Sequence, residues 1–91
     1  MRKRLKLKDR VVRIEDISFD VICPVEDCGN EYHITATKPS FMRNAGKCGH
    51  GTFYVTIMPM KGMVEIAIRF QKTSGGDPAE VEPQNLEIEG E

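Results

Sequence analysis

The sequence predicts a small all-β domain of four to five antiparallel strands. Three observations support this prediction. The chain has 91 residues, which allows one domain. Four apolar runs, at residues 13–23, 31–37, 52–58 and 63–70, alternate with a period of two and are rich in β-branched and aromatic side chains. Turn-forming residues separate these runs, as they do in small β domains.

The alternation groups the residues of each run by face. Ile17, Phe19, Val21 and Cys23 share one parity, and Tyr32, Ile34 and Ala36 share one face. Residues 52–58 have Phe53, Val55 and Ile57 on one face and Tyr54, Thr56 and Met58 on the other. In the last run, Val64, Ile66, Ile68 and Phe70 are expected to point inward. Residues 59–62, Pro-Met-Lys-Gly, predict the turn of a hairpin between the last two runs. Residues 38–47 contain several helix breakers and allow at most a helical turn.

The two ends of the chain carry opposite charge. The formal net charge is −1, but residues 1–13 hold seven Lys or Arg against one acid, and residues 77–91 hold six acids and no base. The C-terminal segment lacks a periodic apolar face, which is typical of disorder. We therefore expect a basic N-terminal arm (1–12), a β domain (13–72) and an acidic, disordered tail (73–91).

Three cysteines and a histidine form the sharpest chemical pattern in the chain. Cys23 and Cys28 bracket one short loop, and after nineteen further residues Cys48 and His50 bracket a glycine. Two pairs of thiolate or imidazole donors on separate turns suit one tetrahedral zinc ion. The sequence therefore predicts one structural Zn²⁺ that is bound by these four residues and clips the hairpins together.

Alternatives to this ligand set stay open at the sequence level. The cysteines could be buried free thiols, because Cys packs as a small apolar residue, or two of them could form a disulfide. His33 could replace His50 as the fourth ligand, although the period of two puts His33 on the face opposite Tyr32. Glu26 or Asp27 could also reach the metal, but closed zinc sites take sulfur and nitrogen donors first.

The cysteine pattern resembles that of zinc-ribbon, or rubredoxin-like, domains. Their ligands lie in Cys-Pro-x-Cys-Gly knuckles on β-hairpins. Cys23 with its following proline and Cys28 with its following glycine match the two ends of such a knuckle, with four residues between the cysteines. The second pair has the form Cys-x-His. The resemblance covers about a third of the chain. It implies a zinc-ribbon-like fold and a role in transcription, translation or nucleic-acid processing, where such domains are common.

The basic arm is the candidate nucleic-acid contact, because Lys and Arg neutralise phosphates. The residues concerned are Arg2, Lys3, Arg4, Lys6 and Lys8. Two other interpretations stay open. The arm could be a solubilising terminus, or an edge strand whose charged outer face prevents edge-to-edge pairing.

The leading functional prediction is a non-enzymatic binding module that acts on nucleic acid or on a nucleic-acid-processing machine. The alternative is a protein–protein adaptor or inhibitor with a purely structural zinc, which uses a sheet edge or the aromatic pair Phe53 and Tyr54. Enzymatic activity is not expected, because four protein ligands close the coordination sphere of zinc. No small-molecule substrate is evident either.

The composition predicts a cytoplasmic protein. No apolar run approaches the roughly 18 residues of a membrane span, so a membrane partner is not expected. An odd number of cysteines fits a secreted disulfide scaffold poorly. In a reducing compartment the thiolates would stay free to bind metal.

Overall fold

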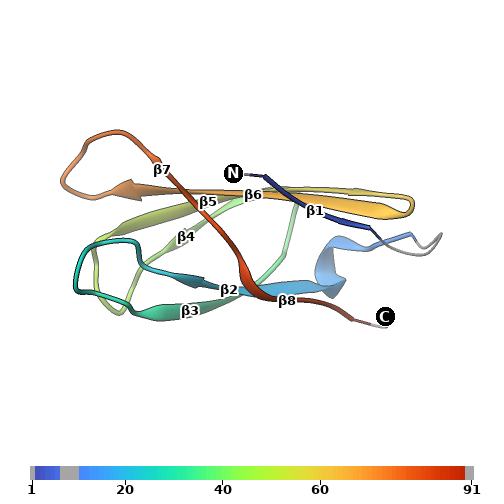
Figure 1. The fold of residues 1–91 in the computed structure, drawn as a ribbon, viewed down its shortest axis with the longest axis horizontal. Coiled ribbons are helices and arrows are strands. Elements are labelled where there is room, and N and C mark those ends of the chain that lie inside the picture. The colour runs from blue at the N-terminus through green and yellow to red at the C-terminus, as the bar shows by residue number, and fades with distance from the viewer. Residues whose placement is uncertain (1, 7–10, 90–91) are drawn as a thin grey trace.

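The computed structural model describes residues 2–6 and 11–89, with side chains from residue 4 onward. Its regular structure is almost entirely strand (Figure 1). The strands are β1 (Arg2–Lys6), β2 (Ile17–Ile22), β3 (Glu31–Thr35), β4 (Ser40–Asn44), β5 (Gly51–Met60), β6 (Met63–Lys72), β7 (Ala79–Val81) and β8 (Gln84–Ile88). A short 3-10 helix, η1 (Ile14–Asp16), precedes β2. All strand pairings of the described residues are antiparallel, which confirms the predicted fold class.

The β5–β6 hairpin is the centre of the larger sheet. Its two strands pair along their whole length, from Gly51 opposite Lys72 to Met60 opposite Met63. The turn falls at residues 61–62, where Gly62 has a φ of 77°. Glycine adopts this left-handed conformation without the Cβ penalty of other residues. The predicted hairpin turn is therefore confirmed.

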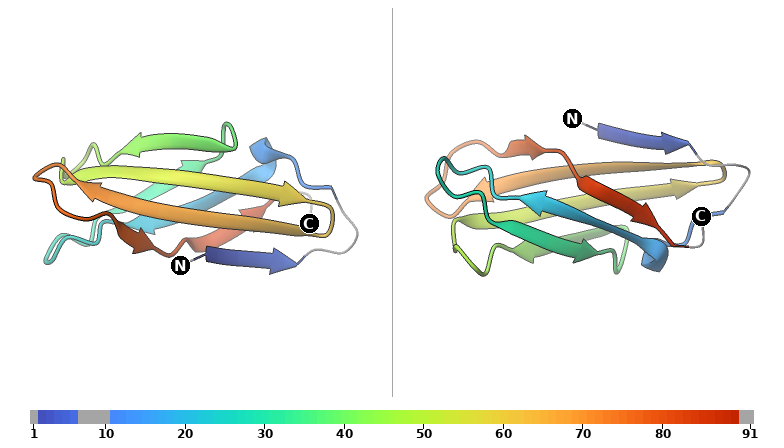
Figure 2. Two further views of the ribbon diagram at one scale, coloured as in Figure 1. Left: turned by 90° about the horizontal axis from the view of Figure 1, so that it is seen from above. Right: turned by 60° about the horizontal axis from the view of Figure 1, so that its bottom comes forward.

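Other strands cover both edges of this hairpin. β4 pairs with β5 on one side. Two short strands pair with the other side of β6, one after the other. β1 pairs with residues 63–67 and β7 with residues 68–70. Figure 2 shows β1 and β7 beside the same long strand, on the side away from β4. The basic and acidic ends of the chain therefore meet on one strand.

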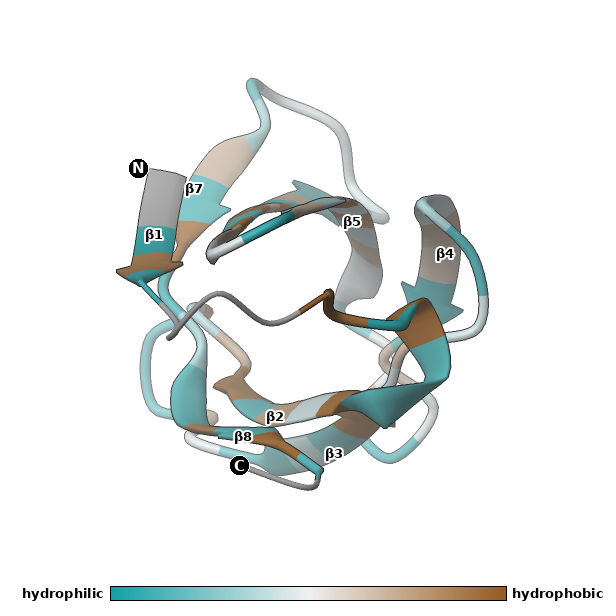
Figure 3. Cartoon of the chain, turned by 90° about the vertical axis from the view of Figure 1, so that its right-hand side faces the viewer, coloured by the Kyte–Doolittle hydropathy of each residue, from teal (hydrophilic) through white to brown (hydrophobic). Residues whose placement is uncertain are grey.

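The smaller sheet has the order β3-β2-β8. It faces the larger sheet across a hydrophobic core (Figure 3). Alternate residues of β2, β3, β5 and β6 point inward, as the pleat of a strand requires. The largest fully buried side chains are Phe19, Phe53, Phe70, Ile17, Ile34, Ile57, Ile66, Ile68, Val21, Val55 and Val64. All of them lie on faces that the alternation grouped, and of the two faces of residues 52–58 the one with Phe53 is buried.

The C-terminal segment differs from the prediction. The expected disordered tail over 73–91 is wrong for β7 and β8, because Val81 and Ile88 are only 8% and 7% exposed. The apolar residues of this segment do alternate, but in two blocks, 81 and 83, then 86 and 88. A register shift in the β2–β8 pairing, where Asn85 has a φ of 49°, separates the blocks. An extra residue at a bulge breaks the period of two, which hides the strands from a pattern search.

The number of strands also exceeds the prediction. The sequence predicts four to five strands, and the described residues form eight. Residues 40–44, where the sequence allowed a helical turn, form β4 instead. Part of the expected N-terminal arm forms β1, as the edge-strand interpretation requires. The segments on either side of residues 13–72 thus contribute strands to the same two sheets.

Candidate metal centre

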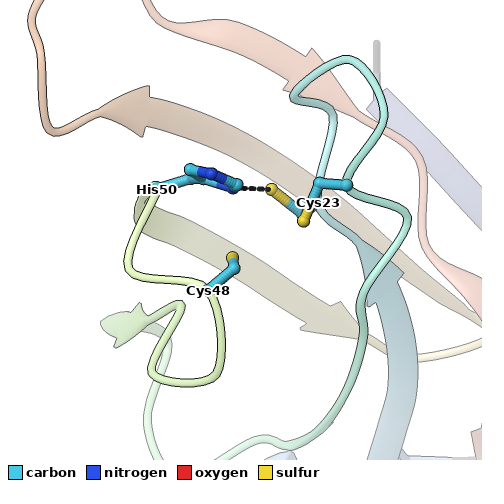
Figure 4. Close-up of side chains that lie close together, drawn as sticks. Cys23, Cys48 and His50 are labelled. Carbon is cyan, nitrogen blue, oxygen red and sulfur yellow. Dashed lines mark hydrogen bonds between the residues drawn. The ribbon is translucent and has the colours of Figure 1, made fainter.

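The four predicted ligands lie on two connections at one end of the molecule. Cys23 and Cys28 belong to the β2–β3 connection, and Cys48 and His50 to the β4–β5 connection, at the left of Figure 1. One donor atom from each residue lies within 4.8 Å of the other three. Figure 4 shows Cys23, Cys48 and His50 pointing toward one another, with Cys23 Sγ 3.6 Å from His50 Nδ1. The structure therefore brings the predicted set together.

The first connection is a tight loop closed by its own backbone. The N–H of Cys28 donates to the carbonyl of Val25 at 3.1 Å, and the N–H of Cys23 donates to the carbonyl of Asn30 at 2.9 Å. Gly29 has a φ of 66°, so a residue without a Cβ turns the chain back toward β3. These contacts bring the two thiols of this connection to one side of the loop.

The second connection is a compact turn between β4 and β5. The N–H of Gly49 donates to the carbonyl of Ala45 at 2.6 Å, and the N–H of Ala45 donates to the carbonyl of Gly51 at 3.0 Å. Gly49 has a φ of 65°. Because this glycine separates Cys48 from His50, its left-handed backbone lets both side chains reach the same point.

Tyr32 connects the candidate centre to the core. Its hydroxyl accepts the N–H of Cys48 at 3.1 Å and lies 2.9 Å from Cys48 Sγ. Since the oxygen accepts the amide, its own O–H is free to donate to the sulfur. The ring packs against Phe53, with centroids 5.8 Å apart. A buried phenol therefore positions the thiol of Cys48.

The cysteines differ in their acidity. Burial raises the pKa of Cys23 to about 11. The hydrogen bond from the Tyr32 hydroxyl, aided by the backbone N–H of His50, lowers the pKa of Cys48 to about 6. At neutral pH Cys48 is therefore a thiolate before any metal binds, whereas a metal has to displace the proton of Cys23.

The alternative ligands lie elsewhere. His33 is on the outer face of the smaller sheet, where its Nδ1 is 2.8 Å from Asp20 Oδ1 and its side chain is 65% exposed. Glu26 and Asp27 are exposed and do not join the four-residue group. All three cysteines are free thiols, with no disulfide. Three thiols and an imidazole at this spacing are consistent with a metal site.

The predicted basic residues lie only partly within the described structure. Arg4 and Lys6 are exposed on β1, and Arg4 Nε forms an ion pair with Glu65 at 3.0 Å. Arg2 and Lys3 have described backbone in β1, but their side chains lie outside the described part. Lys8 lies wholly outside the described residues. The side chains of Arg4 and Lys6 therefore project from the edge of a sheet.

The predicted aromatic pair does not form a joint surface. Phe53 is fully buried, whereas Tyr54 is 43% exposed on the outer face of the larger sheet.

Sequence analysis missed two functional candidates, one beside Tyr54 and one beside Cys48. Arg69 lies directly opposite Tyr54 on β6, and Tyr32 contacts Cys48 across the core. Both relations depend on strand pairing or tertiary contact, for which the sequence carries no local signal.

Comparisons with known proteins leave the family of this chain open. No protein-family model matches the chain, and no curated protein or solved structure shows significant similarity to it. Within the described residues, no helix is long and apolar enough to cross a membrane. A Cys3His cluster in a small all-β fold fits a zinc-binding domain, and the more specific zinc-ribbon resemblance stays a prediction.

Proposed function

We propose that this chain is a non-enzymatic, zinc-stabilised binding module whose ligand is nucleic acid. The observation that carries the choice of ligand is the unequal distribution of charge between the outer faces of the two sheets. The proposed metal stabilises the fold, and the larger sheet provides the binding surface.

The donor chemistry of the site supports zinc. Three cysteines and one histidine form a common ligand set of closed tetrahedral zinc sites, in which sulfur lies about 2.3 Å from the metal. The first two ligands follow β2 of the smaller sheet, and the other two precede β5 of the larger one. Zinc bound by Cys23, Cys28, Cys48 and His50 would therefore clip the two sheets together at one end.

Metal analysis and two histidine variants test the zinc proposal. Protein purified without chelator should contain zinc at near-unit stoichiometry. His50→Ala should weaken zinc binding in a competition titration, whereas His33→Ala should not, because His33 contacts Asp20 on the opposite face of its strand. A larger loss for His33→Ala would reassign the fourth ligand, and protein without zinc would overturn the proposal.

Charge on the two outer faces supports the choice of ligand. On the larger sheet, the described outward side chains include Arg4, Lys6 and Arg69, and the acids Glu65 and Glu80. Glu65 is only 13% exposed and pairs with Arg4, so these two charges offset each other and leave Lys6 and Arg69 against Glu80 in this set. On the smaller sheet, the acidic outward side chains of the described strands are Asp20, Glu31 and Glu87, and His33 lies beside Asp20. Phosphates would therefore be attracted to the larger sheet.

The salt dependence of binding tests this surface. A labelled DNA or RNA oligonucleotide should bind at low salt with a steep negative slope of log affinity against log salt. The double change Lys6→Gln and Arg69→Gln should flatten the slope by about 0.7–0.9 for each lost contact. Arg13→Gln is the matched control, because Arg13 is an exposed base that already pairs with Glu15 near the smaller sheet. An equal effect of the control would remove the larger sheet from the interface.

A protein–protein adaptor or inhibitor with a purely structural zinc is the second candidate. One observation favours it: Met42, which pairs with Tyr54, and Met58, which lies on the same face of β5 as Tyr54, are 67% and 54% exposed. Methionine and tyrosine are enriched in protein interfaces. Absence of oligonucleotide binding at about 50 mM salt, where phosphate contacts are strong, would support this candidate and overturn the first.

A further inference from the structure

The outer face of the larger sheet contains a hollow of about 270 Å³. Its floor includes two small residues that pair across β5 and β6, Thr56 and Ala67. The cross-strand pair Tyr54–Arg69 borders this floor on one side, and the pair Met58–Glu65 borders it on the other. Glu80 of β7 lies beyond Arg69. The hollow exists because short side chains stand between two rows of long ones.

The side chains around the hollow combine an aromatic ring with a guanidinium group. Tyr54 is 43% exposed, and Arg69 is exposed directly opposite it on the neighbouring strand. Exposed aromatic rings beside cations are how proteins bind single-stranded nucleic acids, because every base has a π-face that can stack. The ring supplies the apolar contact and the cation reaches the phosphate.

Two acidic side chains at the hollow restrict which part of a nucleotide can enter it. Glu65 lies in its wall, held by Arg4, and Glu80 lies at its β7 end. Carboxylates repel a phosphate but accept hydrogen bonds from the amino groups of bases. The part of a nucleotide that suits the hollow is therefore the uncharged base, with its phosphate outside beside Arg69.

We propose that this hollow takes an unpaired base of a single-stranded nucleic acid, stacked on Tyr54, with the adjoining phosphate at Arg69. This inference rests on the proposed function and specifies its ligand class. A duplex would be a poor ligand, because its bases are already stacked on one another and their faces are not available to Tyr54. A single strand exposes both the base face and the phosphate that this surface suits.

Fluorescence anisotropy with a labelled mixed-sequence single strand and the duplex of the same sequence tests the inference. The single strand should bind more tightly. Tyr54→Ala should weaken single-strand binding by about 5- to 150-fold, the range measured for loss of base stacking, without changing the salt slope. Tyr54→Phe should keep most of the affinity, because it keeps a ring that stacks.

Two further variants separate the hollow from its surroundings. Ala67→Ile fills the floor with a residue that strands favour and should also weaken single-strand binding. Met60→Ala is the control, since Met60 is 37% exposed on the same strand as Tyr54 but does not line the hollow. Unchanged thermal unfolding of each variant confirms that the fold is kept.

The outcomes distinguish this inference from the function on which it rests. Equal affinity for single strand and duplex, or full affinity of Tyr54→Ala while Lys6→Gln with Arg69→Gln still loses binding, would overturn base stacking and leave nucleic-acid binding in place. An equal loss from Met60→Ala would also overturn the role of the hollow. No binding to either oligonucleotide at about 50 mM salt would overturn both proposals.

Discussion

Tyr32 contacts both the hydrophobic core and the candidate metal centre. Its ring contacts Phe53, which in turn contacts Phe70 at a centroid distance of 4.9 Å. Its hydroxyl holds both the amide and the sulfur of Cys48. Partners that orient the ligands of a metal are a general feature of metal sites. Here that partner comes from β3, so the smaller sheet orients a candidate ligand that precedes β5 of the larger sheet.

Removing the Tyr32 hydroxyl should weaken metal binding without unfolding the chain. In Tyr32→Phe the ring still packs against Phe53, but the pKa of Cys48 rises because its main hydrogen-bond donor is lost. We expect zinc affinity at neutral pH to fall by about 10- to 100-fold, the range seen for outer-shell changes. A competition titration with a chromophoric chelator measures this. Tyr54→Phe is the matched control, and an equal effect of the two variants would contradict the role of Tyr32.

Asp20 should give the smaller sheet an acid-sensitive contact. Its carboxylate accepts hydrogen bonds from Asn85 on β8 at 3.0 Å and from His33 on β3 at 2.8 Å. These bonds, that from Asn85 first, lower the pKa of Asp20 from its ordinary value. A lowered folded pKa means that its stabilisation is fully present above the unfolded pKa near 3.9 and is lost as the pH falls through the folded value.

The stability difference between wild type and Asp20→Ala should therefore be present at pH 5, above the unfolded pKa of about 3.9, and shrink below about pH 4. Urea unfolding across this range measures it. Asp77→Ala serves as the control, since Asp77 is exposed and lies outside the strands. A difference that persists undiminished at the lowest pH would show that the hydrogen bonds of Asp20 are not linked to its ionisation.

At the scale of elements, the start of β5 packs tightly against β6. A Cβ added to Gly51 would lie 2.2 Å from the carbonyl oxygen of Gln71 and 2.6 Å from Phe70 Cζ. Backbone atoms of β6 cannot move away without breaking the hairpin pairing. Gly51 follows His50, so this contact also positions the connection that holds Cys48 and His50.

Gly51→Ala should destabilise the chain by about 1–3 kcal/mol, the usual cost of overpacking. Gly46→Ala provides the comparison, because a Cβ there meets no atom within 4 Å. Chemical denaturation of both variants measures the difference. Equal stability of the two variants would mean that the start of β5 shifts freely to make room for the added methyl group.

The C-terminal strands should contribute to stability although the segment is acidic. Ile88 is buried opposite Ile17, and the N–H of Glu89 donates to the carbonyl of Asp16 at 2.8 Å. Truncating a buried isoleucine costs about 2–5 kcal/mol, so Ile88→Ala should lower the unfolding free energy by an amount at the lower end of that range. Glu87→Ala, an exposed change on the same strand, should have little effect. Unchanged stability of Ile88→Ala would indicate that β8 does not hold the smaller sheet.

At the scale of the whole molecule, the two sheets share a core and meet at one end around the four donors. Structural zinc supplies roughly 10–16 kcal/mol in small peptides, comparable to the whole stability of a domain. A strong chelator should therefore unfold the chain or greatly lower its unfolding midpoint, as followed by far-UV circular dichroism. Cys23→Ser should resemble the chelated protein and respond little to further chelator. An unchanged midpoint would show that the core alone holds the sheets together.

Residue type and spacing alone predicted the four central strands and the four candidate metal donors. A period of two identified β2, β3, β5 and β6 and grouped the residues on each of their faces, since alternation follows directly from the pleat of a strand. The four donors were also visible, because Cys and His on short glycine-containing loops have few other roles. Both features depend only on the type and spacing of residues that are close together in the sequence.

Tertiary structure decided the rest. β8 was hidden because a bulge at Asn85 breaks its alternation, and β1 because its charged face reads equally as a free arm. The choice of His50 over His33 as the group beside the cysteines required the fold, which turns His33 toward Asp20. Tyr32 beside Cys48 and Arg69 opposite Tyr54 arise from contacts between strands distant in sequence, and pairing register, not local pattern, sets which side chains meet.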